Sequence, residues 1–228
     1  PIHLSNTRLT IRAAKGFEPQ LLFRPGADAD EIKYPRSMFT LVGGELRLVH
    51  IHLDLDLSGS WPGAWSLVAM RGAELVTFDD CTLTIRNVAP DLRSSYHPDV
   101  AFLNVQAARG DDMMPMEESH VQESSLNIQL KDCLVRGEAT FLRNRDAVPL
   151  SLDWTNGWVA ISERLIDMSG GQAESGMGAQ MEVDLRHLTA FTNQGLIRSS
   201  CREDAPHPIS LTVRCRDSIL ITGNRASL

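Results

Sequence analysis

Apolar and polar residues follow a recurring eight-residue motif along most of this chain. Its order is apolar, any, apolar, any, any, small or apolar, any, apolar. Six copies fit this order, and they begin at Leu46, Val76, Ile128, Leu152, Val183 and Val213. Apolar residues at alternate positions are typical of a β-strand with one buried face. Recurrence at intervals of roughly 20 to 50 residues indicates a repeat architecture.

A second apolar run precedes each copy of the motif, and a third run follows it. The preceding runs occupy residues 38–42, 66–70, 101–105, 140–143, 165–167 and 196–198. After the first copy, Leu53, Leu55 and Leu57 would face one side of a strand, and Asp54 and Asp56 the solvent-exposed side. Three short strands per repeat, without a helical pattern, predict an all-β fold. The prediction is a right-handed parallel β-helix (solenoid) of about 6–7 coils.

The two variable positions in the middle of the motif predict a corner of each coil. The second of these positions holds His50, Asp80, Asp132, Asn156, His187 and Asp217. Asp and Asn tolerate a turn backbone, so we interpret this column as solvated corner residues. A metal site or an acid–base site is the alternative. The next position should face inward, and it holds Ile51, Cys81, Cys133, Gly157, Leu188 and Ser218.

Segments of variable length separate the first apolar run from the motif, and the longest is an insertion at about 106–125. Loops that recur at one corner of a solenoid decorate one face, which is often a binding face. We therefore predict binding residues in the acidic, methionine-rich part of this insertion, together with one aromatic residue at an outer strand position. They are Asp111, Asp112, Met113, Met114, Glu117, Glu118, His120 and Trp158. Tolerated surface loops without a ligand are the alternative.

Composition and charge restrict the partners of the chain. Its 228 residues carry a formal net charge of −7 and no basic cluster, which argues against nucleic acid. No apolar stretch approaches ~18 residues, so we expect no membrane span. The four cysteines form no CxxC pair, and we expect reduced, buried thiols instead of a zinc site or a disulfide scaffold. We expect no metal and no other cofactor, and nothing in the sequence indicates a compartment.

We interpret residues 1–228 as a single β-helix domain. Neither end shows the polar cap that a solenoid requires. We therefore expect self-association through the uncapped coil ends, or a longer protein of which this chain is a part.

With its coils aligned, the chain resembles right-handed parallel β-helix proteins of the pectin-lyase-like superfamily. The resemblance covers about residues 7–225 and rests on the motif copies and on stretches such as LTIRAAKGFEPQLLF and VTFDDCTLTIRN. Such enzymes would imply a calcium site of clustered carboxylates with an arginine base, or several aspartates with a histidine and an Arg–Lys pair. Neither set is intact, and the stretch RNRD at 143–146 is too short to be assigned a role.

Stretches such as LDWTNGWVAISERL also resemble β-helix regions of large bacterial multidomain proteins. Some of those proteins carry a predicted serine/threonine kinase domain elsewhere. The resemblance would make this chain an accessory segment, because the glycine-rich loop, the HRD motif and the DFG motif of a kinase are absent from it.

Three functions fit these observations. The first is a non-catalytic binding or scaffold module of a larger bacterial protein, which contacts a protein partner or a glycan through loops on one face. It predicts no cleft with a cluster of shifted pKa values. The second is a polysaccharide lyase or glycoside hydrolase, which predicts three or more carboxylates, or an Arg–Lys pair, in a groove on an outer sheet. The third is a structural spacer or an accessory domain of a protein that carries a kinase elsewhere. The missing catalytic motifs favour the first and third, so a non-enzyme is favoured for this segment.

Overall fold

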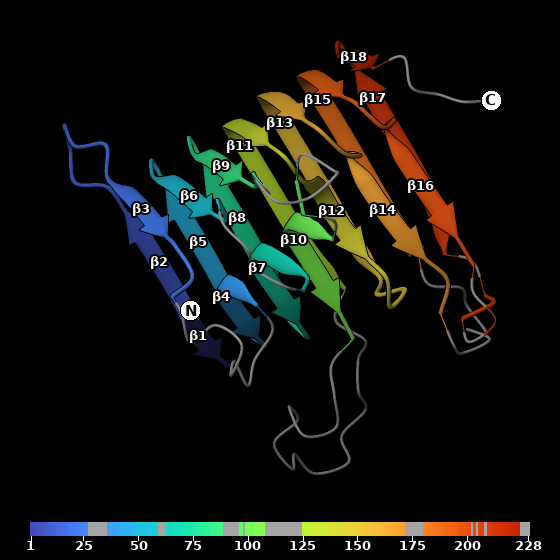
Figure 1. The fold of residues 1–228 in the computed structure, drawn as a ribbon, viewed down its shortest axis with the longest axis horizontal. Helices are drawn as coiled ribbons and strands as arrows, with labels where there is room; N and C mark the ends of the chain where they lie inside the picture. The colour runs from blue at the N-terminus through green and yellow to red at the C-terminus, as the bar shows by residue number, and fades with distance from the viewer. Residues whose placement is uncertain are drawn as a thin grey trace.

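The chain folds into parallel β-strands that stack along one axis (Figure 1). The computed structural model describes residues 1–26, 36–58, 63–88, 96–97, 99–107, 125–171, 180–201, 203, 205–207 and 209–223. All elements within these ranges are strands, so the all-β prediction is confirmed. In the same ranges no helix has the length and apolarity of a membrane span.

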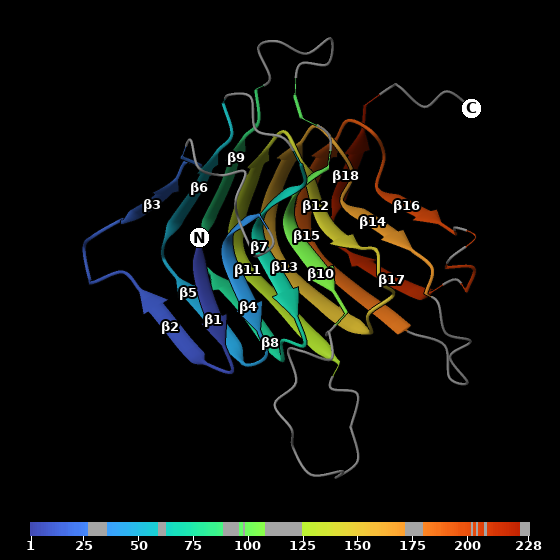
Figure 2. The same cartoon turned by 60° about the horizontal axis from the view of Figure 1, so that its bottom comes forward.

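The strands alternate along the chain between two sheets, which we name sheet A and sheet B (Figure 2). Sheet A has the order β1 (Ile2–Ser5), β4 (Ser37–Val42), β7 (Trp65–Arg71), β10 (Val100–Gln106), β12 (Thr140–Asn144), β14 (Ile166–Ser169) and β16 (Ile197–Ser200). Sheet B contains β2 (Arg8–Arg12), β3 (Gln20–Phe23), β5 (Glu45–Val49), β6 (His52–Asp56), β8 (Leu75–Asp79), β9 (Thr82–Arg86), β11 (Leu126–Gly137), β13 (Leu150–Ile161), β15 (Gln180–Thr192), β17 (Ser210–Arg216) and β18 (Ile219–Thr222).

Each coil consists of one strand of sheet A followed by a bent path through sheet B. The seven sheet A strands of the described residues give seven coils, so the predicted parallel β-helix of six to seven coils is confirmed. In the middle coils the path through sheet B is a single long strand, as in β11, β13 and β15. Crossovers between parallel strands are right-handed in about 98% of cases, and this is the hand that we expect here.

The sequence motif coincides with the register of sheet B. Its first position forms one column of paired residues through the seven coils of the described chain. The column consists of Leu9, Leu46, Val76, Ile128, Leu152, Val183 and Val213. A shift of one residue in any coil would turn its apolar side chains to the outer face. The motif therefore specifies the register, and Leu9 extends the column into the first coil, where the motif is incomplete because Gly16 stands at its last position.

The corner residues have the left-handed backbone that the motif predicts. The φ angles are 57° at His50, 53° at Asp80, 55° at Asp132, 55° at Asn156, 53° at His187 and 49° at Asp217. Asn, Asp and His adopt this region more readily than other residues with a side chain. Neighbouring members of the column also interact. Nδ1 of His50 lies 2.6 Å from Oδ2 of Asp80, and Nδ2 of Asn156 donates to Oδ1 of Asp132 at 2.6 Å.

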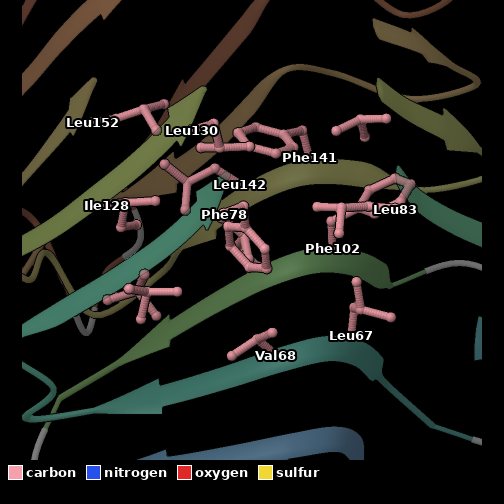
Figure 3. Close-up of a cluster of buried hydrophobic side chains, with 14 of the residues drawn as sticks. Leu67, Val68, Phe78, Leu83, Phe102, Ile128, Leu130, Phe141, Leu142 and Leu152 are labelled. Carbon is pink, nitrogen blue, oxygen red and sulfur yellow. The ribbon is translucent and has the colours of Figure 1, made fainter. Parts of the chain in front are cut away.

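Stacked apolar side chains fill the interior of the coils (Figure 3). The ring of Phe141 in β12 lies 4.7 Å from that of Trp154 in β13, centroid to centroid. At the inward corner position, Gly157 stands where the preceding coil has Cys133. A Cβ atom on Gly157 would meet Nε1 of Trp154 and would lie 2.8 Å from the carbonyl oxygen of Cys133. This coil has glycine at the corner because the indole of Trp154 occupies the space.

The expectation of buried thiols holds for two cysteines and is wrong for the other two. Cys81 and Cys133 are free and buried, whereas Cys201 and Cys215 are free and exposed. Cys215 pairs in register with the buried Leu185 and so belongs to the inward row. It is exposed because, among the described strands, none pairs with the outer edge of β17.

Candidate functional site

Of the predicted binding residues, one lies in the described part of the chain. Trp158 of β13 alternates with the buried Val159 and is 65% exposed, as its outer position predicts. Most of the insertion at 106–125 lies outside the described residues. The predicted residues that lie there with it are Asp111, Asp112, Met113, Met114, Glu117, Glu118 and His120.

Trp158 belongs to an apolar group on the outer face of sheet B. Trp158 pairs in register with Thr189 of β15, and Thr189 pairs with Ile219 of β18. Two positions further along these strands, Phe191 pairs with Ile221. Side chains two residues apart share a face of a strand. We name the resulting group the Trp158 patch, and it consists of Trp158, Phe191 (47% exposed), Ile219 (60%) and Ile221 (48%).

A second surface feature is a pocket on the outer side of sheet A, over its C-terminal coils. We name it the arginine pocket. The charged residues that line it are Asp99, Arg143, Glu163, Arg164, Asp167 and Arg198. Arg145 lies beside it and contacts two of the carboxylates.

The register of sheet A builds this pocket. Arg143 of β12 pairs with Asp167 of β14, and Asp167 pairs with Arg198 of β16. Asn104 of β10 precedes Arg143 in the same column. The residue before Arg143, Leu142, belongs to the core, so Arg143 points outward. Neighbouring strands therefore place opposite charges side by side on the outer face.

Asp167 is the central acceptor of the pocket. Its carboxylate accepts hydrogen bonds from Nε and Nη2 of Arg198, both at 2.7 Å, and from Nη2 of Arg145 at 3.3 Å. Burial raises the pKa of Asp167, but the hydrogen bonds from Arg198 and the charges of the surrounding arginines outweigh it and keep the pKa below its ordinary value. Asp167 is therefore ionised at neutral pH and has no proton to donate as a general acid.

Arg143 is the buried guanidinium of the pocket, with a side chain 6% exposed. Its Nη1 donates to the backbone carbonyl oxygen of Asp99 at 2.7 Å. Burial and the nearby charge of Arg145 lower the pKa of Arg143. The carboxylate of Asp99 accepts a hydrogen bond from Nη2 of Arg145 at 2.9 Å. Arg143 thus shares its carboxylate neighbours with other arginines.

Glu163, Gln194 and Tyr96 form a hydrogen-bonded rim at the pocket. Nε2 of Gln194 donates to Oε1 of Glu163 at 2.7 Å and to the Tyr96 hydroxyl oxygen at 3.1 Å. Nη1 of Arg164 lies 3.6 Å from Oε2 of Glu163. Burial and the interaction with Glu163 raise the pKa of Tyr96. The rim thus joins side chains from segments far apart in the sequence.

The arginine pocket corrects two expectations. A cleft with shifted pKa values is present, although the binding-module hypothesis predicts none. The stretch RNRD at 143–146, to which the sequence assigned no role, supplies Arg143 and Arg145. The sequence signal that could have predicted this site lies in the apolar runs that form the strands of sheet A. When they are aligned by their apolar residues, the polar positions form a column of Asn104, Arg143, Asp167 and Arg198.

Asp54 and Asp56 of β6 are 3% and 2% exposed, so the prediction of a solvent-exposed pair is wrong. They lie on the outer face as predicted, but side chains of the adjoining coils cover them. Asp54 accepts hydrogen bonds from Nε2 of Gln20 at 3.0 Å and Nη2 of Arg86 at 2.5 Å. Asp56 accepts one from Nη2 of Arg24 at 2.5 Å. The pair is thus neutralised by arginines and forms part of the structural framework.

Acid should weaken the fold through Asp56. Burial raises the pKa of Asp56, but hydrogen bonds from Ser58 and Arg24 outweigh it and lower the pKa from 3.8 to about 2. A carboxyl group with a lowered folded-state pKa stabilises the protein above its unfolded pKa, and this contribution is lost as the pH falls through the folded value. We expect the free energy of unfolding to decrease between pH 3.8 and about 2, and to decrease less in Asp56→Asn. Urea unfolding over this pH range measures the effect, and identical pH profiles would contradict it.

Within the described ranges, no group of three or more His, Cys, Asp and Glu side chains is arranged to hold a metal ion. A scan against protein-family models, a search of curated proteins and a search of solved structures found no match. The fold and the two surface features define the class of this protein. It is a parallel β-helix that carries an apolar patch on sheet B and a charged pocket on sheet A.

Proposed function

We propose that this chain is a non-catalytic binding module that contacts a protein partner through the Trp158 patch. Contiguous exposed apolar residues on a soluble protein mark interaction sites. Tryptophan is enriched among the residues that dominate binding energy at such sites. The observation that carries the proposal is the 65% exposure of Trp158 beside three further exposed apolar side chains.

The chemistry of the patch favours a protein over a glycan. Ile219 and Ile221 present only hydrocarbon, which cannot hydrogen-bond to the hydroxyl groups of a sugar. On the neighbouring strand β11, the exposed Arg136 borders the patch, two residues from Leu134, which pairs with Trp158. An apolar centre with a polar rim is the usual anatomy of a protein–protein interface.

The resemblance to β-helix regions of large bacterial multidomain proteins supports this proposal. It would make the chain an accessory module that binds or positions a partner for another domain. An accessory role beside a serine/threonine kinase domain, and self-association through the coil ends, remain predictions. Binding by the loops at 106–125 also remains a prediction.

Substitution of Trp158 tests the proposal. Proteins captured by the immobilised chain are identified and purified, and the Kd of each is measured against the wild type and Trp158→Ser. Loss of a central aromatic residue costs about 2 kcal/mol or more at such sites, so we expect Kd to rise roughly 30-fold. Phe17→Ser is the matched control, because Phe17 is an equally exposed aromatic residue in the first coil, and its Kd should not change.

Two outcomes would count against this function. If Trp158→Ser leaves the Kd of the captured proteins unchanged, the Trp158 patch is not their binding site. The same conclusion follows if Phe17→Ser raises the Kd as much as Trp158→Ser does. Binding to a glycan array that disappears in Trp158→Ser would replace the protein partner with a glycan.

A second candidate is a carbohydrate-active enzyme, and the arginine pocket is the observation that favours it. The pocket gathers the carboxylates of Asp99, Glu163 and Asp167, as the enzyme hypothesis predicts. A glycosidase also needs a carboxyl group with a raised pKa, whereas the pKa of Asp167 is lowered. Incubation with a panel of polysaccharides, followed by assays for reducing ends and unsaturated products, tests this function. Activity that is lost in Glu163→Gln would establish it.

A further inference from the structure

The guanidinium of Arg143 has more hydrogen-bond donors than acceptors around it. Arginine carries five N–H groups. In the described part of the chain, Arg143 makes one hydrogen bond, from Nη1 to the backbone oxygen of Asp99. Its Nε is buried and has no hydrogen-bond partner among the described residues. A buried charged donor without an acceptor is costly, so an acceptor atom brought into the pocket beside Arg143 would be stabilised there.

The carboxylates near Arg143 are engaged by other arginines. Asp167 receives both donors of the Arg198 fork at 2.7 Å, while Nε of Arg143 stays 3.8 Å away. Asp99 accepts from Arg145 at 2.9 Å, and Nη2 of Arg143 lies 3.6 Å from it. Both separations of Arg143 exceed the length of a normal N–H···O hydrogen bond. Neither carboxylate therefore completes the hydrogen bonding of Arg143.

The charges around the pocket leave a positive excess. Among the described residues, the four guanidinium groups of Arg143, Arg145, Arg164 and Arg198 face the three carboxylates of Asp99, Glu163 and Asp167. One positive charge therefore has no counter-charge at this site, although the chain as a whole carries −7. A ligand with one negative charge would balance the group.

We propose that the arginine pocket binds a small oxyanion, the carboxylate, phosphate or sulfate group of a ligand, against the guanidinium of Arg143. Two oxygen atoms of such a group match the planar donor fork of arginine. Arg164 and Thr140 line the same pocket and supply a second cation and a hydroxyl group. The site lies on sheet A and is independent of the Trp158 patch on sheet B, so either proposal can fail alone.

Titration with simple anions tests this site. Inorganic phosphate, sulfate and acetate are added to the whole chain at constant ionic strength with chloride as the reference, and calorimetry or NMR shifts report binding. We expect saturable binding to one site. Arg143→Lys keeps the charge but loses the fork, and Arg164→Gln removes one cation, so each should weaken binding about tenfold or more. Arg214→Gln is the control, because Arg214 is an exposed arginine paired with Glu182 on sheet B, and it should bind as the wild type does.

The anions also distinguish the sources of the oxyanion. Binding of phosphate and sulfate without acetate would assign the site to a phosphoryl or sulfuryl group, and binding of acetate would assign it to a carboxylate. The proposal is overturned if no anion saturates, or if Arg214→Gln weakens binding as much as the pocket variants. Circular dichroism checks the folding of each variant. If Arg143→Lys does not fold, unchanged binding by the less buried Arg164→Gln would still overturn the proposal.

Discussion

Replacement of Asp167 by Asn is expected to lower the free energy of unfolding by about 3 to 5 kcal/mol. The substitution preserves the shape of the side chain but removes the negative charge that faces Arg143, Arg145 and Arg198. The Arg143 side chain is only 6% exposed, so water compensates poorly for the lost counter-charge. Urea unfolding of the two proteins at neutral pH measures the difference.

Asp184→Asn is the matched control for this prediction. Asp184 pairs with Arg186 through the same two-bond geometry, with distances of 3.0 and 2.7 Å. Arg186 is exposed, and exposed ion pairs contribute little to stability. We expect Asp184→Asn to unfold as the wild type does. If Asp167→Asn and Asp184→Asn lower the free energy of unfolding by similar amounts, the burial of Arg143 does not explain the contribution of Asp167.

Gly157→Ala is expected to destabilise the protein by about 1 to 3 kcal/mol, because the added methyl group enters a filled corner. The new atom would meet Nε1 of Trp154 on one side and the carbonyl oxygen of Cys133 on the other. Gly26→Ala is the control, since a Cβ atom at Gly26 meets nothing within 4 Å among the described residues. Thermal and urea unfolding would measure both changes.

A double-mutant cycle identifies the cause of the Gly157 effect. Leu130 and Leu185 occupy the neighbouring coils at the position of Trp154, so Trp154→Leu restores the residue used there. The cost of Gly157→Ala should be smaller in the Trp154→Leu background, because the indole that the methyl group meets is gone. Strictly additive costs would assign the strain to the Cys133 backbone instead.

The sequence predicts the architecture well where one side chain decides the local structure. The apolar positions of the motif specify the register of sheet B from Leu46 to Val213. The corner column could be predicted because the left-handed backbone favours few residue types. Asp and Asn are two of them, and they stand at positions 80, 156 and 217. Each of these inferences depends on the residue itself and its neighbours along the chain.

The sites were harder to predict because they depend on side chains from different coils. Asp54 and Asp56 alternate with leucines as exposed residues do, yet Arg24 and Arg86 of the adjoining coils bury them. The role of Asp167 likewise depends on arginines of other strands. The alternation of apolar and polar residues predicts which side chains point outward, but it does not predict which charges meet there. The exposure of Cys215 follows from the absence of a further described strand, a property that its own motif cannot show.

The stacking of seven coils has a consequence for how the molecule can change. In a solenoid each unit contacts only its nearest neighbours, so stability is approximately a sum of local terms along one dimension. The Asp54–Asp56 network joins β3, β6 and β9 in the first three coils, whereas the arginine pocket uses Asp99 before β10 together with β12, β14 and β16, in the last four. The two charged assemblies share no coil and, among the described residues, meet where Asn87, after β9, hydrogen-bonds to the backbone of His97 at the pocket, so their coupling should be weak. One end of this protein can therefore diversify its surface chemistry while the other keeps its own unaltered.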